Sequence, residues 1–174
     1  MTTPEELKQY VRDIPGYPQP GIVFRDITPL LANKERFREV IDMMSEHWSA
    51  RRPDLVAAIE ARGFIPGAAI AVKLNAGFIP IRKAGKLPWK TIAESYQLEY
   101  GTDQLQLHLD AVGPGQKVLI VDDVLATGGT AAAAVRLIRK LGGEVVGVQV
   151  LIELEDLGGR KRLSDVEVVS EIVY

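Results

Sequence analysis

Residues 118–130 read Val118-Leu-Ile-Val-Asp122-Asp123-Val-Leu-Ala126-Thr127-Gly128-Gly129-Thr130, and this stretch decides the fold. An apolar strand ends in two adjacent carboxylates, a glycine-rich turn follows, and a helix begins at the last threonine. In open α/β sheets, ligands bind at the carboxyl ends of strands, and a helix N-terminus at that edge favours anions. The stretch therefore predicts an α/β fold whose ligand site is built on this turn.

The residue types in the turn indicate which ligand it binds. Gly128 and Gly129 allow backbone N–H groups to surround a phosphate, and the two threonines add hydroxyl donors. The paired acids repel a phosphate but can each accept a hydrogen bond from a neutral diol. Ribose 5-phosphate carries both groups, so we predict a sugar-phosphate site formed by Asp122, Asp123, Ala126, Thr127, Gly128, Gly129 and Thr130.

Other interpretations of this turn fit less well. A purely structural strand–turn–helix with solvated acids is the plain alternative. A P-loop would end in Gly-Lys-Ser or Gly-Lys-Thr, and a dinucleotide-binding turn would read G-x-G-x-x-G. Residues 118–130 contain neither pattern.

Strands and helices alternate along the rest of the chain. We expect strands at residues 55–60, 77–82, 117–121, 144–154 and 166–172, and helices from Thr3-Pro4 and at residues 33–51, 66–74 and 130–141. Residues 91–100 and 105–109 predict a hairpin lying outside the main sheet. Because the inner strands are apolar on both faces, the pattern predicts a mostly parallel sheet covered by helices.

Composition narrows the class of protein. A chain of 174 residues with 47% hydrophobic and 25% charged residues is expected to be one globular domain, 1–174. Its 21 basic and 23 acidic residues argue against nucleic-acid binding, and the absence of cysteine excludes disulfides and thiolate metal sites. Neither a signal-peptide core nor a membrane-length apolar stretch is found, so we expect no membrane association and a cytoplasmic location.

Residues 118–130 resemble, without a gap, the phosphoribosyl-pyrophosphate loop of the type I phosphoribosyltransferases. The chain as a whole is similar to the adenine-specific branch of that family. The resemblance implies a central, mostly parallel sheet flanked by helices, with a hairpin hood at about residues 84–110 over the active site. It also implies transfer of a 5-phosphoribosyl group from phosphoribosyl pyrophosphate to adenine, which gives AMP and pyrophosphate.

The segment Pro20-Gly-Ile-Val-Phe24-Arg25-Asp26-Ile-Thr-Pro resembles the family's base-binding segment. The resemblance implies that Phe24 stacks on adenine and that backbone groups of Val23 and Arg25 contact the edge of the base. It places Leu154 among the apolar residues of the same pocket. Without the resemblance, Phe24 would be interpreted as a core residue.

Two further segments resemble the family's pyrophosphate-binding loops. The first, Glu60-Ala61-Arg62-Gly63-Phe64, begins with Glu-Ala where the family often has Asp-Ser. The second, residues 81–88, Ile-Arg-Lys-Ala-Gly-Lys-Leu-Pro, follows the next expected strand. The resemblance makes the cations of both segments candidates for binding pyrophosphate, whereas each segment alone would be interpreted as a solvated turn; these cations are Arg62, Arg82, Lys83 and Lys86.

Residues 95–101, Ser-Tyr-Gln-Leu-Glu-Tyr-Gly, resemble the family's mobile hood. Glu99 falls at the position of the catalytic carboxylate, and Tyr100 is its neighbour in the hood. A glutamate in a surface hairpin would otherwise be interpreted as solvated. The resemblance also implies a Mg²⁺ ion bound mainly through the substrate, with no direct protein ligand, and a homodimer.

Three alternatives remain open at the level of sequence. The acceptor could be hypoxanthine, guanine or xanthine, although we find no acidic or lysine-bearing element placed to bind a 6-oxo group. A regulator that binds DNA would need a DNA-reading module and a basic face. A synthase of the phosphoribosyl donor would need a nucleotide site and a longer chain.

Overall fold

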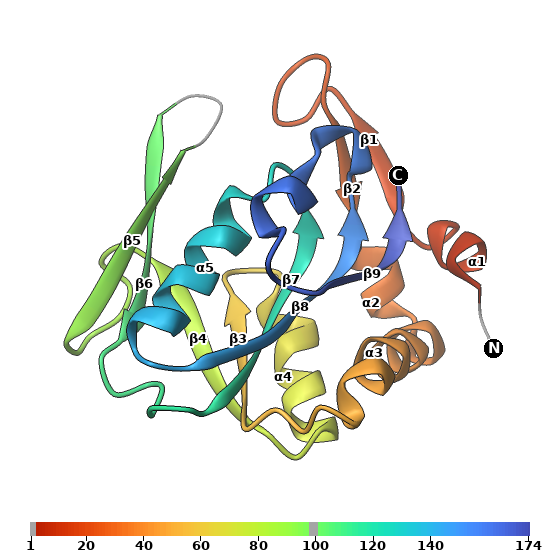
Figure 1. Cartoon of the computed structure of the whole chain (residues 1–174). Helices are drawn as coiled ribbons and strands as arrows, with labels where there is room; N and C mark the ends of the chain where they lie inside the picture. The colour runs from red at the N-terminus through yellow and green to blue at the C-terminus, as the bar shows by residue number, and fades with distance from the viewer. Residues whose placement is uncertain (1–2, 98–100) are drawn as a thin grey trace.

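The computed structural model describes residues 3–97 and 101–174 and contains a seven-stranded sheet (Figure 1). The strand order is β5-β6-β4-β3-β7-β8-β9. Strands β4, β3, β7, β8 and β9 are parallel, and β5 and β6 form an antiparallel hairpin at one edge. The strands are β3 (Leu55–Ile59), β4 (Gly77–Lys83), β5 (Thr91–Gln97), β6 (Thr102–His108), β7 (Lys117–Leu125), β8 (Glu144–Glu153) and β9 (Val168–Val173).

Helices cover both faces of the sheet, as the sequence predicted. Val118 and Ile120 of β7 pack in the core cluster that includes α5, whereas Leu119 and Val121 pack in the cluster that includes α3 and α4. The alternation of β7 side chains between the two clusters explains why this strand is apolar on both faces. The helices are α1 (Pro4–Lys8), α2 (Thr28–Ala32), α3 (Lys34–Ser49), α4 (Phe64–Lys73) and α5 (Gly129–Lys140), with 3₁₀ turns η1 (Glu155–Leu157) and η2 (Gly159–Leu163).

A second, two-stranded sheet lies beside the C-terminal ends of β8 and β9 (Figure 1). It pairs β1 (Arg12–Pro15) with β2 (Val23–Asp26) in antiparallel register, with Ile14 opposite Phe24. The Pro- and Gly-rich passage around residues 14–29 thus contains only short regular elements. Within the described residues, no helix has the length and apolar character needed to cross a bilayer.

Two expectations from the sequence were wrong in detail. The hairpin does not lie outside the sheet, because β6 pairs with the end of β4 through Arg82 opposite Gln106 and Lys83 opposite Leu105. Strand β7 also continues past Val121 to Leu125, because β8 pairs with it along this length. The two acids at positions 122 and 123 therefore lie within the strand near its end, where the ladder fixes their directions.

Close packing of α3 on the sheet depends on a glycine. Trp48 of α3 is fully buried, and its indole Nε1 donates a hydrogen bond of 2.6 Å to Gln149 Oε1 in β8. Gly147, also in β8, lies directly under the indole ring, and a Cβ there would overlap Trp48 Cη2 and Cζ3. The absence of a side chain at this position is what admits the indole.

We therefore expect Gly147→Ala to lower the free energy of unfolding by about 1–3 kcal/mol through overpacking. Urea unfolding followed by tryptophan fluorescence measures the change. Gly113→Ala is the matched control, because the atoms nearest to its added methyl belong to the flexible Gln116 side chain, with Oε1 at 3.2 Å. Equal losses in the two variants would contradict the packing argument.

Candidate active site

Arg62 lies where three separate segments of the chain meet. Its Nε is 2.7 Å from Asp123 Oδ2, and its Nη1 donates a hydrogen bond of 3.3 Å to the carbonyl oxygen of Arg25. Its guanidinium carbon is 4.5 Å from the centre of the Phe24 ring. The structure thus brings together the predicted base-binding segment, the loop after β3 and the acid pair of β7.

Strand pairing explains how these segments meet. Strands β3 and β7 are parallel neighbours, with Ala58 opposite Val121, so the segments at their carboxyl ends share one edge of the sheet. Gly63, which follows Arg62, allows the closest approach. A Cβ there would lie 2.5 Å from the Ile59 carbonyl oxygen and 2.8 Å from Asp122 Oδ1. Only glycine fits at position 63 without a shift of the acid pair.

The two acids of β7 have different environments. Asp123 is buried and is bound by Arg62, whereas Asp122 is partly exposed and its Oδ1 accepts a hydrogen bond of 2.8 Å from the Asp123 N–H. Desolvation, followed by the charge of Asp123, raises the pKa of Asp122 well above the usual value for aspartate. A ligand that donates hydrogen bonds, such as a diol, would favour the ionised form of Asp122.

The turn after β7 surrounds a small pocket of about 70 Å³. Its lining includes Asp122, Ala126, Thr127, Gly128 and Thr130, and α5 begins at Gly129. Gly128 has a φ of +79°, and a Cβ there would overlap the carbonyl group of Gly159. Five of the seven predicted sugar-phosphate residues therefore line one pocket at a helix N-terminus, whereas Asp123 is buried beside Arg62 and Gly129 is the first residue of α5.

Gly159 is a supporting residue that the sequence analysis missed. A Cβ on Gly159 would overlap the carbonyl oxygen of Ala126 and lie 3.1 Å from the Gly128 nitrogen. The η2 turn therefore packs directly against the turn at residues 126–130, which is called the phosphate loop below. The doublet Gly158-Gly159 was the available signal in the sequence, but nothing local indicated which loop it contacts.

The predicted cations at the end of β4 and in the turn after it are paired with carboxylates. Arg82 Nη2 is 3.0 Å and Lys86 Nζ is 3.7 Å from Glu60 Oε2, while the Lys83 N–H donates to Glu60 Oε1 at 2.5 Å. Burial raises the pKa of Glu60, but these hydrogen bonds and charges outweigh burial and hold it below its usual value. The Lys83 ammonium is 3.0 Å from Asp103 Oδ2 in β6. These cations are thus held in place, not free in a solvated turn.

The predicted base-binding segment presents a half-buried aromatic ring. Phe24 is in edge contact with Tyr17, with ring centres 5.2 Å apart, and lies against Arg62 on another side. It is therefore not a core residue, which was the plain alternative. The Arg25 side chain instead forms an ion pair with Asp13 and stacks on Tyr174, so only its backbone lies toward Arg62. Tyr17, which the sequence analysis missed, adds a second exposed aromatic ring.

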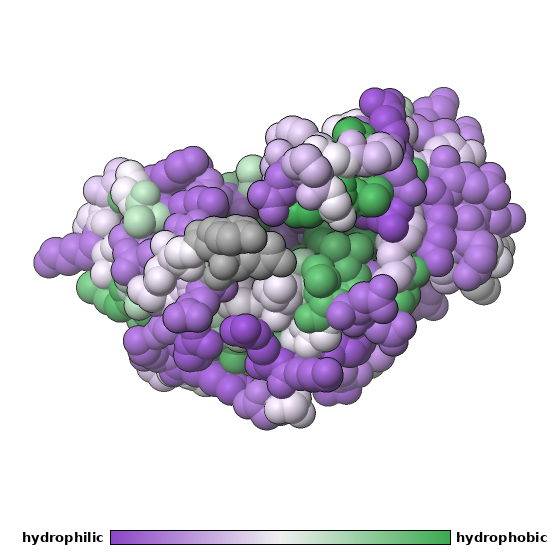
Figure 2. Space-filling model, turned by 90° about the horizontal axis from the view of Figure 1, so that it is seen from above, coloured by the Kyte–Doolittle hydropathy of each residue, from purple (hydrophilic) through white to green (hydrophobic). Residues whose placement is uncertain are grey.

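The remaining base-site residues differ in exposure. Val23 is 41% exposed, beside Phe24 in β2. Leu154 directly follows β8, is partly buried, and donates its N–H to the Leu125 carbonyl oxygen at 2.9 Å. Leu154 therefore lies at the same sheet edge as the phosphate loop. Figure 2, which views the molecule from above, shows apolar surface at this edge with hydrophilic residues around it.

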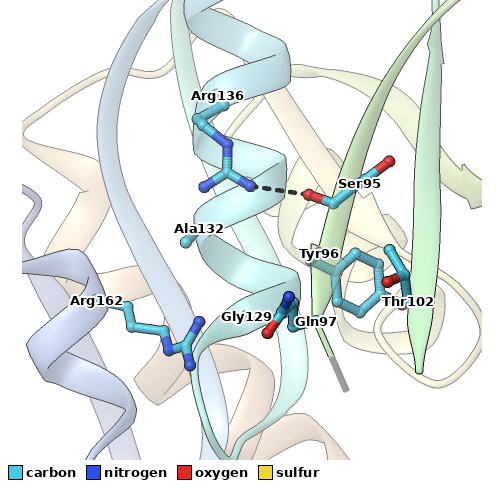
Figure 3. A pocket seen from close by; sticks show the side chains of 8 residues that line it. All are labelled: Ser95, Tyr96, Gln97, Thr102, Gly129, Ala132, Arg136 and Arg162. Carbon is cyan, nitrogen blue, oxygen red and sulfur yellow. Dashed lines mark hydrogen bonds between the residues drawn. The ribbon is translucent and has the colours of Figure 1, made fainter. Parts of the chain in front are cut away.

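Glu99 and Tyr100 lie outside the described residues, so their predicted roles stay predictions. The hairpin that carries them forms one wall of a hollow of about 320 Å³, and α5 forms the other (Figure 3). Arg136 donates to Glu94 and to the Ser95 carbonyl oxygen across this gap, at 2.9 and 3.3 Å. The lining residues are Ser95, Tyr96, Gln97, Thr102, Gly129, Ala132, Arg136 and Arg162.

Metal binding by the protein alone has no support in the part of the chain that the structure describes. There, no three His, Cys, Asp or Glu side chains gather as a metal site would require. Of the two adjacent acids in β7, Asp123 already binds Arg62. The expectation of a Mg²⁺ ion bound mainly through the substrate stays a prediction.

Comparison with known proteins gives consistent matches. The family model for the phosphoribosyl transferase domain matches residues 26–173. The adenine phosphoribosyltransferase of Thermotoga maritima is 63% identical over 169 residues, which cover 97% of this chain and 98% of the relative. That of Thermobifida fusca is 62% identical over 161 residues, 92% of each chain.

Solved structures agree. The crystal structure of the adenine phosphoribosyltransferase of Thermoanaerobacter pseudethanolicus superposes with a TM-score of 0.96 at 49% identity, covering 99% of this chain and 100% of that one. The enzyme of Saccharomyces cerevisiae, solved with adenine and an imino-altritol bisphosphate, gives 0.93 at 36% identity, covering 97% and 98%. The chain therefore belongs to the adenine phosphoribosyltransferases, within the phosphoribosyl transferase family.

Proposed function

We propose that this protein transfers the 5-phosphoribosyl group of phosphoribosyl pyrophosphate to N9 of adenine, producing AMP and pyrophosphate. The observation that carries the proposal is the position of Arg62, between the Phe24 ring and the Asp123 carboxylate. A base on Phe24, a sugar at the acids and a phosphate in the turn at Thr127–Thr130 lie in the order of the parts of AMP. The yeast relative bound to adenine supports the choice of acceptor.

The sugar and its 5-phosphate are held by the turn after β7. Asp122 and Asp123 accept hydrogen bonds from the ribose hydroxyls, and backbone N–H groups at the start of α5 bind the phosphate. Fixing the sugar at both ends aligns C1 with the attacking nitrogen, which provides the orientation that a displacement needs.

The leaving pyrophosphate binds beside the sugar, where Arg62, Arg82, Lys83 and Lys86 offset its charge as the bond to C1 breaks. Bound Mg²⁺ would supply further positive charge to the pyrophosphate oxygens. Because three of these cations contact Glu60 or Asp123, pyrophosphate replaces part of an existing set of ion pairs. The donor is thus bound by groups that are already positioned.

Adenine stacks on Phe24, and backbone groups of Val23 and Arg25 contact its edge, with Leu154 on the apolar side of the pocket. Glu99 in the hood accepts the adenine proton or stabilises the positive charge on the sugar at the transition state. The hood keeps water from the reacting centre. A homodimer and a cytoplasmic location, expected from the sequence analysis, remain predictions.

A turnover assay tests the function directly. With donor and Mg²⁺, adenine should be converted to AMP with a kcat/KM at least about a hundredfold above that of hypoxanthine, guanine or xanthine, because a site built for one base edge leaves polar groups unpaired with another. A kcat/KM for a 6-oxopurine equal to that for adenine would show that the site is not specific for adenine. Absence of transfer to any base would overturn the proposal.

Asp122→Asn should separate stability from donor binding. Because the pKa of Asp122 is raised in the folded chain, its ionisation costs stability as the pH rises through that value. The uncharged variant should resist urea better than wild type at pH 8. The difference in unfolding free energy should shrink as the pH is lowered toward the usual pKa range of aspartate. Its KM for the donor should rise by about tenfold or more, since a charged acceptor is lost.

Asp165→Asn is the control for this variant. Asp165 is exposed and paired with Arg139 at 2.7 Å, and this pair lowers its pKa, so the same change there should give no stabilisation at pH 8. If Asp122→Asn is no more stable than wild type at pH 8, ionisation of Asp122 does not cost the stability that its raised pKa implies.

Glu99→Leu should reduce kcat by about a hundredfold or more while the Kd for the donor changes little, because general-base and charge-stabilising roles act in the transition state. Glu144→Leu is the control, since Glu144 is exposed at the opposite, N-terminal end of β8. Steady-state kinetics with calorimetric donor binding measures both quantities. Near-normal turnover of Glu99→Leu would remove Glu99 from the mechanism.

A further inference from the structure

Asp103, in the hairpin strand β6, binds two residues from two other strands. Its Oδ2 is 3.0 Å from the Lys83 ammonium at the end of β4 and accepts a hydrogen bond of 3.1 Å from the Tyr96 hydroxyl in β5. Its Oδ1 accepts the Gln104 N–H at 2.8 Å. The sequence analysis gave this residue no role.

Each partner of Asp103 adjoins one end of the donor site. Lys83 is among the cations proposed to bind pyrophosphate. Tyr96 is 7% exposed and lies against the first turn of α5, where a Cβ on Gly129 would be 3.6 Å from Tyr96 Cδ2. Figure 3 shows Tyr96 and Gly129 on facing sides of the gap between the hairpin and α5. Asp103 thus connects the pyrophosphate side of the site to the phosphate loop.

The charges of this group are fixed near neutral pH. The hydrogen bond to Asp103 raises the pKa of Lys83, and the same contact lowers the pKa of Asp103. Burial, followed by the charge of Asp103, raises the pKa of Tyr96, and a hydrogen bond with the Thr130 side chain opposes that rise. Lys83 therefore stays protonated, and an ammonium with three donors can bind a phosphate oxygen without leaving Asp103.

The hairpin is held together by interactions other than those of the Asp103 side chain. Strands β5 and β6 pair in continuous register from Thr91 opposite His108 to Gln97 opposite Thr102. The ladder, together with buried Leu105 and Leu107, holds the two strands together. What Asp103 adds is the contact to Lys83, which the ladder does not provide.

We propose that Asp103 is a positioning residue for the donor: it holds the Lys83 ammonium toward the pyrophosphate and ties that cation, through Tyr96, to the phosphate loop. The inference rests on the proposed function and adds a residue to its donor site. Asp103 itself contacts neither the base nor the reacting carbon.

The test compares Asp103→Asn, Asp103→Glu and wild type by calorimetric binding of Mg²⁺–phosphoribosyl pyrophosphate without adenine, then by kinetics. Asp103→Asn should raise the donor Kd and KM roughly threefold to tenfold, as expected for a partly exposed charged pair. The KM for adenine should stay within about twofold. Asp103→Glu, which keeps the charge, should recover part of the affinity.

Two variants identify the route of the effect. If Asp103 acts through Lys83, the double variant Asp103→Asn/Lys83→Met should bind the donor as Lys83→Met does, whereas independent effects would multiply. Tyr96→Phe keeps the ring against Gly129 and removes only the hydroxyl, so it should cause a smaller loss. Asp165→Asn, which breaks the exposed pair with Arg139, is the matched control and should leave donor binding unchanged.

Three results would overturn the inference. Donor affinity of Asp103→Asn equal to or higher than that of wild type would show that the carboxylate does not contribute to donor binding or competes with pyrophosphate. Multiplicative losses in the double variant would exclude action through Lys83. A fall in melting temperature with equal losses for donor and adenine would show a structural role. A wild-type protein that binds donor but transfers it to no base would refute the proposed function alone.

Discussion

The ion pair between Arg62 and Asp123 exists because β3 and β7 run parallel and side by side. That pairing places the loop after β3 against the end of β7, and Gly63 lets the two backbones approach closely enough for the side chains to meet. The same arginine then reaches Phe24 and the Arg25 carbonyl in β2. This strand pairing therefore brings the proposed sugar site and part of the proposed base and pyrophosphate sites together.

Carboxylates offset most of the positive charge at this edge of the sheet before any substrate binds. Glu60 offsets Arg82 and Lys86, Asp103 offsets Lys83, and Asp123 offsets Arg62. Bringing several cations together without such partners would be costly, because like charges repel and are partly removed from water. Asp122 is the exception, since its pKa is raised and it is not in an ion pair with Arg62. Ionising Asp122 lowers the stability of the fold, and functional sites retain such a group when ligand binding depends on it.

The parts of the fold that depend on local pattern could be predicted from the sequence. The apolar run of β7, the glycines at its turn and the start of α5 lie within thirteen consecutive residues. The strand, the turn and the beginning of the helix could therefore be predicted from one short stretch. The attachment of the hairpin to β4 was missed because pairing between distant strands leaves no local signal. Gly159, Tyr17 and Asp103 were missed for the same reason, since each acquires its importance from a residue far along the chain.

The attachment of the hairpin bears most directly on catalysis, since the predicted Glu99 lies between its two strands. The hairpin is paired along its whole length internally, but it joins β4 through only Arg82 and Lys83. In the described chain, ion pairs also join it to its neighbours, Glu94 with Arg136 and Lys140 of α5 and Asp103 with Lys83. Its buried side chains Tyr96, Leu105 and Leu107 pack in the core cluster that includes α5. Because the backbone connection to β4 is short, the orientation of the hairpin depends on these ion pairs together with the apolar packing on α5. Lys83 takes part both in the backbone connection to the hairpin and in the ion pair with Asp103. Because Lys83 is also a proposed pyrophosphate ligand, the same residue contributes to donor binding and to the position of the hairpin. Under the proposed function, Lys83 therefore links the position of the hairpin to the binding of the leaving pyrophosphate.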